Sequence, residues 1–332
     1  MKEALATPIL QRLARKAGVK IVTEPKYAYA GQIILADGTR SYFLGTRFDL
    51  NPLGASEIAK DKSYAQYFLQ VLGYPTIEGE SFFSPEWAER VRIAWGPDAA
   101  YRYAKALGFP VIVKPNSLSQ GFGVTKVYNK REFMQAVRII CRKDRVFLVQ
   151  REVQGRDYRV VVLDDEMISA YERLPLSVRG DGTSTIAHLI ERKQDEFRRS
   201  GRDTNIKQDD VRISNRLKRL GCERSSVLAE GEMVALLDNR NLSSGGEAID
   251  VTREIHPEFV RLCIRITADM GLRYCGVDLM VDGDIREPVG RYWVIELNAA
   301  PGIGNYASSG PVQERIVEEM YLKVLRAIAR RT

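Results

Sequence analysis

The spacing of apolar and polar residues along this 332-residue chain predicts a mixture of helices and strands. Apolar positions three and four residues apart predict helices over residues 5–16, 62–72, 97–107, 130–141, 256–270 and 311–330. Short apolar or alternating runs predict strands over residues 19–22, 32–35, 41–44, 111–115, 146–150, 276–281 and 294–298. Both kinds of element are therefore expected in the fold.

The last predicted strand carries the first candidate chemistry. Glu296 and Asn298 are two residues apart, so they point to the same face of that strand. A carboxylate and an amide oxygen side by side suit Mg²⁺ or Mn²⁺. If the strands 276–281 and 294–298 pair, Asp278 joins them as a third oxygen ligand. The alternative is that both strands present ordinary polar residues to solvent.

A predicted strand with one charge, Lys114, precedes a small glycine-containing loop at residues 116–124. Lysine is rarely buried without a partner, and glycine lets backbone N–H groups approach a phosphate closely. The loop is neither a Walker A motif nor a dinucleotide-binding fingerprint. Strand and loop together favour phosphate binding about as strongly as the alternative, a simple hairpin turn. A second lysine, Lys62, starts a helix after the predicted N-cap Asp61, where an isolated lysine is usually exposed to solvent.

Residues 150–163 indicate a hinge between two lobes, because a strand leaves through a short polar crossover and another strand follows. The backbone edge of such a crossover can pair with a nucleotide base. The carboxylate of Asp157 can accept hydrogen bonds from ribose hydroxyls, and the alternative is an ordinary acidic residue in a turn.

The second half of the chain supplies candidate substrate groups. Residues 179–190 predict a loop that enters a helix capped by Ser184 or Thr185. The charged segment 191–225 predicts mainly a solvated face and, as the alternative, a mobile lid over the substrate. The loop 239–246 combines amides, hydroxyls and glycines with Arg240, so it can present donors to an anion.

Composition narrows the class of protein. The net charge is +7, but the basic residues are mixed with acids, so a small anionic substrate such as ATP explains the excess as well as nucleic acid does. The four cysteines have no metal-ligand spacing and fit reduced thiols in the cytoplasm. Two histidines exclude a His-rich zinc site. No apolar run is long enough for a membrane span, and the N-terminus has no secretory pattern.

Taken in order, these features resemble the ATP-grasp superfamily of carboxylate–amine ligases, and most of all the ATP-grasp modules of cyanophycin synthetases and bifunctional glutathione synthetases. Eight motifs carry the resemblance: DK at 61–62, VIVKP at 111–115, SQGFGV at 119–124, QREVQGRDYRVVV at 150–162, GDGTSTIAHLI at 180–190, NLSSGGEAIDVT at 241–252, GVDLMV at 276–281 and VIELNAAPG at 294–302. The resemblance extends from roughly residue 55 to the end of the sequence.

The resemblance implies an ATP-grasp fold, in which two α+β subdomains hold ATP between them after a short pre-ATP-grasp-like region. We expect this lead-in at residues 1–60, where no catalytic constellation is visible. The first subdomain, with the lysines, the glycine-rich loop and the hinge, is expected at 61–175. The second, with the substrate loops, the metal site and the C-terminal helix, is expected at 176–332.

The resemblance also implies roles for individual residues. The phosphates of ATP would contact Lys62, Lys114, Ser119, Gln120, Gly121 and Gly123. The adenine would lie on the hinge at Gln150, Arg151 and Val153, with Asp157 at the ribose. Arg173, Asn241 and Lys114 would act on the transferred phosphoryl group. Asp278, Glu296 and Asn298 would hold two Mg²⁺, or Mn²⁺ in their place. The pocket for the acid substrate is expected at Arg212, Arg240, Ser243, Gly245 and Gly246.

The implied function is ATP-dependent ligation of a carboxylate to an amine through an acyl phosphate, with amino acids or peptides as substrates and with release of ADP and phosphate. The proteins it resembles carry further domains, so we expect a stand-alone ligase and do not carry over their substrates. The alternatives are an ATP-dependent kinase and a non-catalytic nucleotide-binding regulator. A homodimer is left open, whereas neither a membrane nor nucleic acid is expected as a partner.

Overall fold

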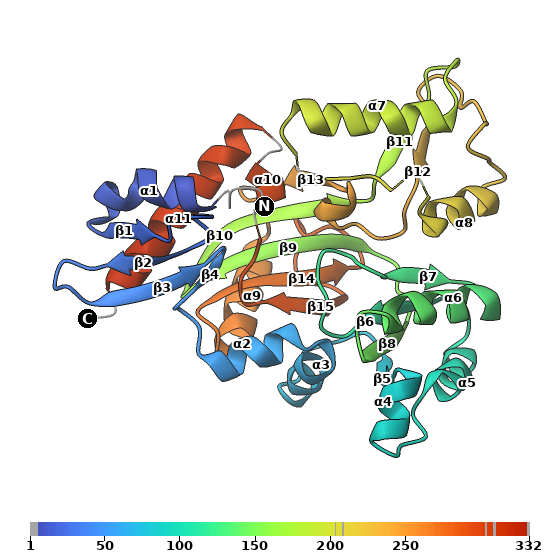
Figure 1. Cartoon of the computed structure of the whole chain (residues 1–332), viewed down its shortest axis with the longest axis horizontal. Helices are drawn as coiled ribbons and strands as arrows, with labels where there is room; N and C mark the ends of the chain where they lie inside the picture. The colour runs from blue at the N-terminus through green and yellow to red at the C-terminus, as the bar shows by residue number, and fades with distance from the viewer. Residues whose placement is uncertain (1–5, 203, 208, 303, 308–309, 331–332) are drawn as a thin grey trace.

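A five-stranded antiparallel sheet runs through the middle of the protein (Figure 1). The structure is a computed structural model that describes residues 6–202, 204–207, 209–302, 304–307 and 310–330. The strand order of this central sheet is β13-β10-β9-β14-β15. In that order the strands span Glu247–Asp250, Glu166–Leu174, Arg156–Leu163, Tyr274–Val281 and Tyr292–Asn298. Each neighbouring pair is antiparallel.

The central sheet has two different faces because its side chains alternate in direction. One face packs on helix α9 (Pro257–Asp269) through a core that includes Tyr158, Val160 and Val277. The other face is apolar at one end, where Val161 and Leu163 lie in a second core. Its other end carries charged residues, and that end forms the candidate site.

The N-terminal part and the C-terminal helix together cover the apolar end. Helix α1 (Ala6–Ala17) packs against α11 (Pro311–Ala329), and Figure 1 shows these blue and red helices side by side. A four-stranded antiparallel sheet accompanies them, with β1 at Lys20–Thr23, β2 at Ala30–Ile34, β3 at Arg40–Leu44 and β4 at Arg47–Phe48. The predicted strands 32–35 and 41–44 are joined by a turn at residues 37–38 and pair as β2 and β3.

A separate four-stranded sheet forms a lobe beyond the polar end of the central sheet. Its order is β5-β8-β6-β7, with strands at Gly79–Phe83, Val146–Arg151, Val111–Pro115 and Thr125–Val127. Helices α4 (Pro85–Arg90), α5 (Pro97–Leu107) and α6 (Lys130–Cys141) belong to this lobe. The predicted helices 97–107 and 130–141 and the predicted strand 111–115 are confirmed.

Residues 176–237, which we call the cap, follow strand β10 and have a core of their own. Strand β11 (Ser177–Arg179) pairs with β12 (Met233–Ala235), and helices α7 (Ile186–Arg199) and α8 (Val211–Arg219) share this core. The side chain of Thr185 accepts a hydrogen bond from the N–H of His188, so one of the two predicted caps of this helix is confirmed. The cap rises at the upper right of Figure 1, above the lobe.

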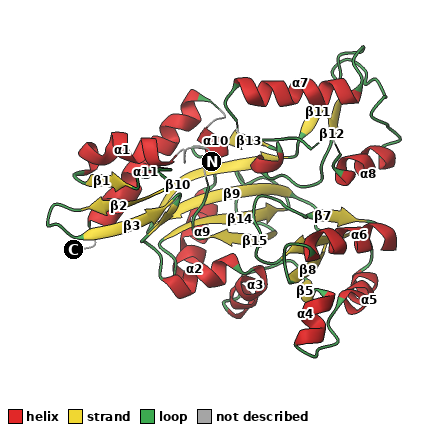
Figure 2. Cartoon of the chain, in the orientation of Figure 1, coloured by secondary structure: helices red, strands yellow, loops and turns green. Residues whose placement is uncertain are grey.

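The remaining elements are short. Helices α2 (Leu53–Lys60) and α3 (Lys62–Val71) lie along strand β15, η1 (Leu242–Ser244) follows the cap, and α10 (Gly304–Ala307) precedes α11. Figure 2 shows helices and strands throughout, so the expected α+β mixture is confirmed. No helix in the described ranges is both long enough and apolar enough to cross a membrane.

The chain passes from the lobe to the central sheet between β8 and β9, where a hinge was predicted. The expected boundary after residue 175 lies at the end of β10. Because β10 pairs with β9, the strands of the central sheet occur on both sides of this boundary. The three subdomain ranges stay a prediction.

Candidate active site

Four strands of the central sheet bring polar side chains to one end of one face. Strand β9 contributes Asp157 and Arg159, which are two residues apart. The register pairs Arg173 of β10 with Asp157, and Asp278 of β14 with Arg159. Paired residues on antiparallel strands point to the same face, so these side chains share one surface. Asp278 is also paired with Glu296 of β15, which confirms the predicted meeting of these two acids.

Asp278 lies between two guanidinium groups. Arg159 donates from Nε and Nη2 to its two carboxylate oxygens at 2.6 and 2.7 Å, and Nη1 of Arg173 lies 2.9 Å from Oδ2. Arg173 also donates from Nη2 to Oδ1 of Asp157 at 2.6 Å. Asp278 and Asp157 are 1% and 8% exposed. Removing charges from water is costly unless they are paired, which explains why acids and arginines alternate here.

Burial and charge act in opposite directions on these acids. Burial raises the pKa of Asp278, but the attraction of Arg159 and Arg173 outweighs it, so the net pKa lies below its usual value. For Asp157 burial prevails over Arg173, and its pKa is raised. Asp157 lies within a strand rather than in a turn, so the turn alternative is wrong. Its contact with a ribose stays a prediction.

A β-bulge in β15 sets the direction of Glu296. The register shifts by one residue at this point, so Ile295 is an extra residue opposite the partner strand. Val294 and Leu297 consequently both lie in the core beneath α9, although they are three residues apart. Glu296 is left on the site face beside Asp278. Strict alternation would have placed Val294 and Leu297 on opposite faces.

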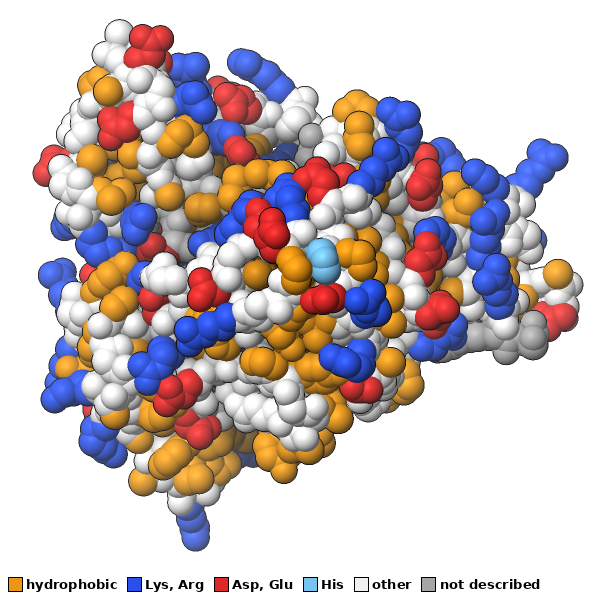
Figure 3. Space-filling model, turned by 180° about the vertical axis from the view of Figure 1, so that it is seen from behind, with side chains coloured by type: hydrophobic (Ala, Val, Ile, Leu, Met, Phe, Trp, Pro, Cys, Tyr) orange, Lys and Arg blue, Asp and Glu red, His pale blue; other side chains and the backbone are white. Residues whose placement is uncertain are grey.

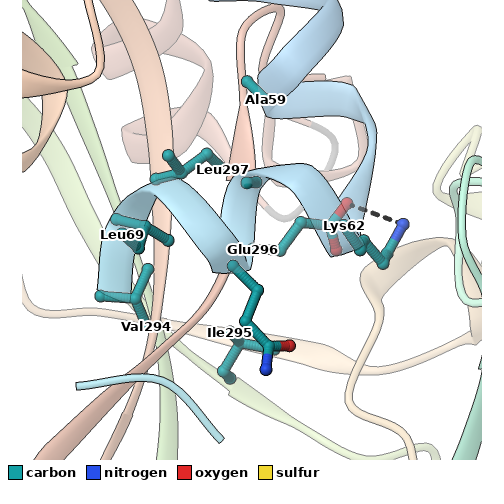
Figure 4. A pocket seen from close by; sticks show the side chains of 9 residues that line it. Ala59, Lys62, Leu69, Val294, Ile295, Glu296 and Leu297 are labelled. Carbon is teal, nitrogen blue, oxygen red and sulfur yellow. Dashed lines mark ion pairs between the residues drawn. The ribbon is translucent and has the colours of Figure 1, made fainter. Parts of the chain in front are cut away.

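Lys62 reaches this surface from outside the sheet. Its ammonium lies 3.5 Å from Oε1 of Glu296 and donates to the carbonyl oxygens of Asn116 and Leu118 at 3.3 and 3.0 Å. Figure 4 shows the ion pair beside a small pocket between α3 and β15. Lys62 is only 8% exposed, so the expectation of a solvated lysine is wrong. Its helix starts against β15 rather than at a free surface.

Lys114 is a buried charge with no partner among the described residues. It is 5% exposed, and within the described part of the chain its ammonium makes no hydrogen bond or ion pair. Burial lowers its pKa to about 8; Lys62 adds to this shift, and Glu296 and Asp278 oppose it. An unpaired buried ammonium is unfavourable, so an anion placed beside it would relieve that cost.

We call residues 119–124 the phosphate loop. Its carbonyl oxygens are bound by side chains of the protein, whereas two of its N–H groups are not. The carbonyl oxygen of Gly121 accepts hydrogen bonds from Arg212 at 3.2 Å and from Asn239 at 3.3 Å, and that of Gln120 accepts one from Ser244 at 3.4 Å. The N–H groups of Gln120 and Gly121 donate to no other described residue. Free N–H groups in a tight loop suit phosphate oxygens.

Glycine is required at two positions of the phosphate loop. Gly121 and Gly123 have φ of +68° and +67°. A Cβ at Gly121 would lie 2.8 Å from Oδ1 of Asn241, and a Cβ at Gly123 would lie 2.8 Å from Cγ1 of Ile140. The loop joins the antiparallel strands β6 and β7. The hairpin alternative therefore describes its topology, while its free N–H groups favour the phosphate hypothesis. The packing also brings the predicted catalytic residue Asn241 next to the loop.

The predicted hinge offers free backbone at its middle. The N–H and carbonyl of Val153 make no hydrogen bond with any other described residue, so they can pair with a base. The side chains of the neighbouring hinge residues make hydrogen bonds within the protein. Gln150 donates to Gln66 at 2.9 Å, and Arg151 donates to Glu78 at 2.8 Å.

The residues predicted for the acid substrate have different surroundings. Arg240 donates to the carbonyl oxygen of Gly155 at 2.9 Å, which places it beside the hinge. Gly245 has a φ of +98°, and a Cβ there would lie 2.9 Å from Leu176. The carbonyl oxygen of Gly246 accepts a hydrogen bond from Arg202 at 2.5 Å. The two glycines therefore shape the loop backbone. Ser243 lies in η1.

The guanidinium of Arg212 binds groups of the protein itself. Nη2 donates to Asp210 at 2.7 Å, and Nη1 donates to the carbonyl oxygens of Gly121 and Val124, each at 3.2 Å. These protein acceptors take up most of the guanidinium. The structure therefore places Arg212 on the phosphate loop, and its role in the acid pocket stays a prediction.

The oxygen atoms of Glu296 and Asn298 suit a divalent cation, whereas those of Asp278 are largely occupied by arginines. Among the described residues no group of three or more His, Cys, Asp and Glu could hold a metal, and the predicted set instead combines two acids with Asn298. The amide nitrogen of Asn298 donates to Gly276 at 3.5 Å, which leaves its oxygen for an ion. A carboxylate has about four acceptor positions, and three contacts with arginines occupy Asp278. Mg²⁺ would be held by Glu296 and Asn298, with Asp278 contributing one oxygen or a bridging water.

Sequence reasoning missed two residues of the site, Arg159 and Asn116. Arg159 had a usable signal, because it lies two residues after Asp157 in a predicted strand and so had to share its face. Asn116 accepts from the N–H of Ser63 at 3.0 Å and donates to Asp61 at 2.6 Å. These partners lie more than 50 residues away, and no local pattern predicts them.

Comparison with known proteins identifies the class. Residues 68–182 match the family model described as D-ala D-ala ligase C-terminus. A crystal structure of a bifunctional glutathione synthetase from Pasteurella multocida superposes with a TM-score of 0.58 and 26% identity, over 95% of this chain and 44% of that one. These matches agree with the resemblance: residues 68–182 carry a domain of that ligase family, and the fold is similar to that of the glutathione synthetase.

Two curated relatives define the similarity more closely. The glutathione biosynthesis bifunctional protein GshAB of Mannheimia succiniciproducens is 36% identical over 207 residues, which is 58% of this chain and 27% of that protein. The cyanophycin synthetase of a Synechocystis species is 34% identical over 254 residues, which is 74% of this chain and 28% of that protein. The chain thus spans less than a third of the length of these two relatives.

Proposed function

We propose that this protein is an ATP-dependent carboxylate–amine ligase. The observation that carries the proposal is that hydrogen-bond donors with no partner in the described structure occur together with oxygen ligands. The donors are the Lys114 ammonium and the N–H groups of the phosphate loop, which suit phosphate oxygens. The ligands are Glu296 and Asn298, which suit a divalent cation. The ligase and synthetase names of the matched family and relatives support this class of reaction.

The proposed reaction has two steps. An oxygen of the substrate carboxylate attacks the γ-phosphorus of ATP, the bond to the bridging oxygen breaks, and ADP leaves behind an acyl phosphate. The amine nitrogen then attacks the acyl carbon, the carbon–oxygen bond to phosphate breaks, and the nitrogen loses a proton as the amide forms. No protein side chain becomes covalently attached in either step.

The residues of the site would position the reactants and neutralise charge. Lys62, Lys114 and Arg173 would place positive charge beside the transferred phosphoryl group. Asn241, which packs against the phosphate loop, would contribute an amide donor. The adenine would pair with the backbone at Val153, and Asp157 would be nearest to the ribose.

ATP-grasp ligases use ATP and a divalent metal ion. We propose two Mg²⁺ ions for this protein, replaceable by Mn²⁺, with Asp278, Glu296 and Asn298 as the protein ligands. A bound ion would neutralise negative charge on the phosphate oxygens. The restricted access to Asp278 suggests that Glu296 is the principal carboxylate of the pair.

The experiment that tests the function is an ADP-release assay with Mg²⁺ across a matrix of amino acids and short peptides, with products read by mass spectrometry. A ligase releases ADP only when an acid and an amine are both present, and its product is lighter by one water than their sum. ADP release with one substrate and a stable phosphorylated product would instead establish a kinase. ATP binding without turnover in any combination would favour the regulator.

The chemistry of the substrates follows from the charges at the site. Within the described residues, the Arg240 side chain makes one hydrogen bond, to Gly155, and its guanidinium has further donors. It would therefore suit the free carboxylate of an amino acid or peptide. Nucleic acid stays the weaker hypothesis, because the face seen in Figure 3 mixes Lys and Arg with Asp and Glu rather than forming one basic surface.

We also propose a homodimer and a reducing compartment such as the cytoplasm. Five large apolar residues on one side of α3 are 40 to 66% exposed, namely Tyr64, Tyr67, Phe68, Val71 and Leu72. A second copy could cover such a stripe, and Val71→Glu should then reduce the mass seen by sedimentation to that of one chain. All four cysteines are free thiols, which fits a reducing environment.

A further inference from the structure

Three side chains from the second half of the chain hold carbonyl groups of the phosphate loop. Arg212 donates to Gly121 and Val124, Asn239 donates to Gly121, and Ser244 donates to Gln120. Arg212 is the one charged donor among these three. It binds carbonyl oxygens at both ends of the turn, so it acts on the conformation of the whole loop.

The direction of the loop donors follows from the planar peptide unit. In a trans peptide the carbonyl of one residue and the N–H of the next point in opposite directions. The carbonyl of Gln120 accepts from Ser244, so the N–H of Gly121 points away from that contact. The next unit is held by Arg212, and its N–H, on Phe122, closes the turn by donating to Ser119. Of these two units, the one held by Ser244 has the free N–H, on Gly121, and the one held by Arg212 closes the turn that keeps this N–H in place.

The guanidinium of Arg212 is itself held rigidly. Asp210 accepts from its Nε at 3.0 Å and from its Nη2 at 2.7 Å, and the same carboxylate accepts the backbone N–H of Arg212 at 2.9 Å as the N-cap of α8. The side chain of Arg212 is 21% exposed. A bidentate pair with fixed geometry presents the remaining Nη1 in one direction. The position of α8 therefore sets the position of the loop.

The cap meets the lobe through further polar contacts at the same helix. Arg219, near the end of α8, lies 3.4 Å from Glu132 of α6, and its guanidinium carbon lies 4.2 Å from the ring centroid of Tyr128. The apolar core of the cap is formed by its own elements. Docking of the cap on the lobe thus depends on directional contacts, of which the contact of Arg212 with the phosphate loop is one.

We propose that Arg212 is a positioning residue for the nucleotide phosphates. By holding the carbonyl groups of Gly121 and Val124, it keeps the phosphate loop in the conformation that presents its N–H groups, and it links that conformation to the docked cap. The inference deepens the proposed function and rests on it, because the phosphates concerned are those of ATP.

The test compares Arg212→Ala and Arg212→Lys with a matched control, Arg216→Ala. Arg216 lies on the same helix and pairs with Asp238 at 3.0 Å, and it has no hydrogen bond with the phosphate loop in the described structure. Two quantities are measured for each protein. One is the hydrogen-exchange rate of the amides of residues 119–124 without nucleotide, and the other is the ratio of the affinities for ATP and AMP.

Arg212→Ala should accelerate exchange at the Phe122 and Val124 amides, which close the turn. It should lower the preference for ATP over AMP by about tenfold, since one or two charge-assisted hydrogen bonds from loop N–H groups to the phosphates would be lost. AMP lacks the β- and γ-phosphates and should bind as before. Arg212→Lys keeps the charge but loses the planar fork, so it should recover only part of the preference. Arg216→Ala should change neither quantity.

Two results would overturn the inference: unchanged exchange and an unchanged ATP-to-AMP preference in Arg212→Ala, or the same changes in Arg216→Ala. Failure of the proposed function has a different signature. In that case the unaltered protein binds no ATP, whereas refutation of the role of Arg212 alone requires normal ATP binding by the unaltered protein.

Discussion

At the scale of single residues, the site is a set of charges whose partners differ in distance and burial. Asp278 is fully enclosed by Arg159 and Arg173, whereas Glu296 is 24% exposed in its side chain and lies 3.5 Å from Lys62. The two acids predicted as metal ligands therefore do different work in the folded protein. One balances buried arginines, and the other is available to a ligand.

Conservative amide substitutions should separate these two roles. Glu296→Gln should abolish turnover with little loss of stability, because its ion pair is long and partly exposed. Asp278→Asn should abolish turnover and also lower the free energy of unfolding by about 3 kcal/mol, because two buried guanidinium groups lose their shared counter-charge. Turnover assays and denaturant unfolding measure both effects.

The control for these substitutions is Glu318→Gln, which removes only a surface pair with Arg12. Activity retained in Glu296→Gln would contradict its role as a metal ligand. A normal stability of Asp278→Asn would show that the arginines find other partners.

The titration of Lys114 predicts a pH dependence of both stability and binding. Its pKa is about 8 in the folded protein, below the usual 10.5, mainly because of burial. The unfolded chain therefore holds more protons between these two values, so the free energy of unfolding should rise from pH 8 toward pH 10.5. ATP affinity should fall over the same interval, because the ammonium that we propose as a phosphate ligand becomes neutral.

Calorimetric ATP titrations between pH 7 and pH 10 test this dependence on either side of the lowered value. Lys114→Gln should bind ATP weakly at every pH and show a flatter profile. An equally steep profile in Lys114→Gln would assign the dependence to another group.

At the scale of elements, the N-terminus of α3 connects stability with the site. Oδ1 of Asp61 accepts the N–H groups of Ser63 and Tyr64 at 3.1 and 3.0 Å, and Oδ2 accepts from Asn116 at 2.6 Å. The same helix start carries Lys62. A single cap residue therefore fixes both the helix and the direction of a predicted phosphate ligand.

Asp61→Ala should lower stability by about 1 to 2 kcal/mol through loss of the cap and should also weaken ATP binding. The matched control is Ser84→Ala, which removes the cap of α4, where Ser84 accepts the N–H of Trp87 at 3.3 Å. That variant should lose similar stability with unchanged ATP affinity. If both variants bind ATP equally well, the link between the cap and Lys62 is refuted.

At the scale of the whole molecule, the cores are separate from the charged surface. The core beneath α1 and α11 includes Leu10, which is fully buried, but none of the predicted site residues. The lobe and the cap each have another core. The site lies where these parts meet, so it depends on their relative placement rather than on any one of them.

Leu10→Ala should therefore lower the free energy of unfolding by about 3 kcal/mol, as expected for a fully buried leucine, while leaving the KM for ATP unchanged. Thermal unfolding and steady-state kinetics below the transition measure the two effects. A large change in KM at intact fold would show that the N-terminal part contributes to the site.

The sequence by itself determined the local structure and most of the candidate ligands. Periodicity and cap residues are local properties, so helices 97–107 and 130–141, the strand 111–115 and the N-cap Asp61 could be predicted. Glu296 and Asn298 could be placed on one face, because two-residue spacing alone decides it. The resemblance to ATP-grasp proteins followed from the order of such motifs.

Only the tertiary structure decided which charges are paired and which are free. Arg159 meets Asp278 across 119 residues, and Arg212 meets Gly121 across 91. Such pairs depend on strand register, on the bulge at Ile295 and on the docking of the cap, which no local pattern specifies. For the same reason Lys62 proved to be buried, whereas Lys114 is left without a partner in the described structure.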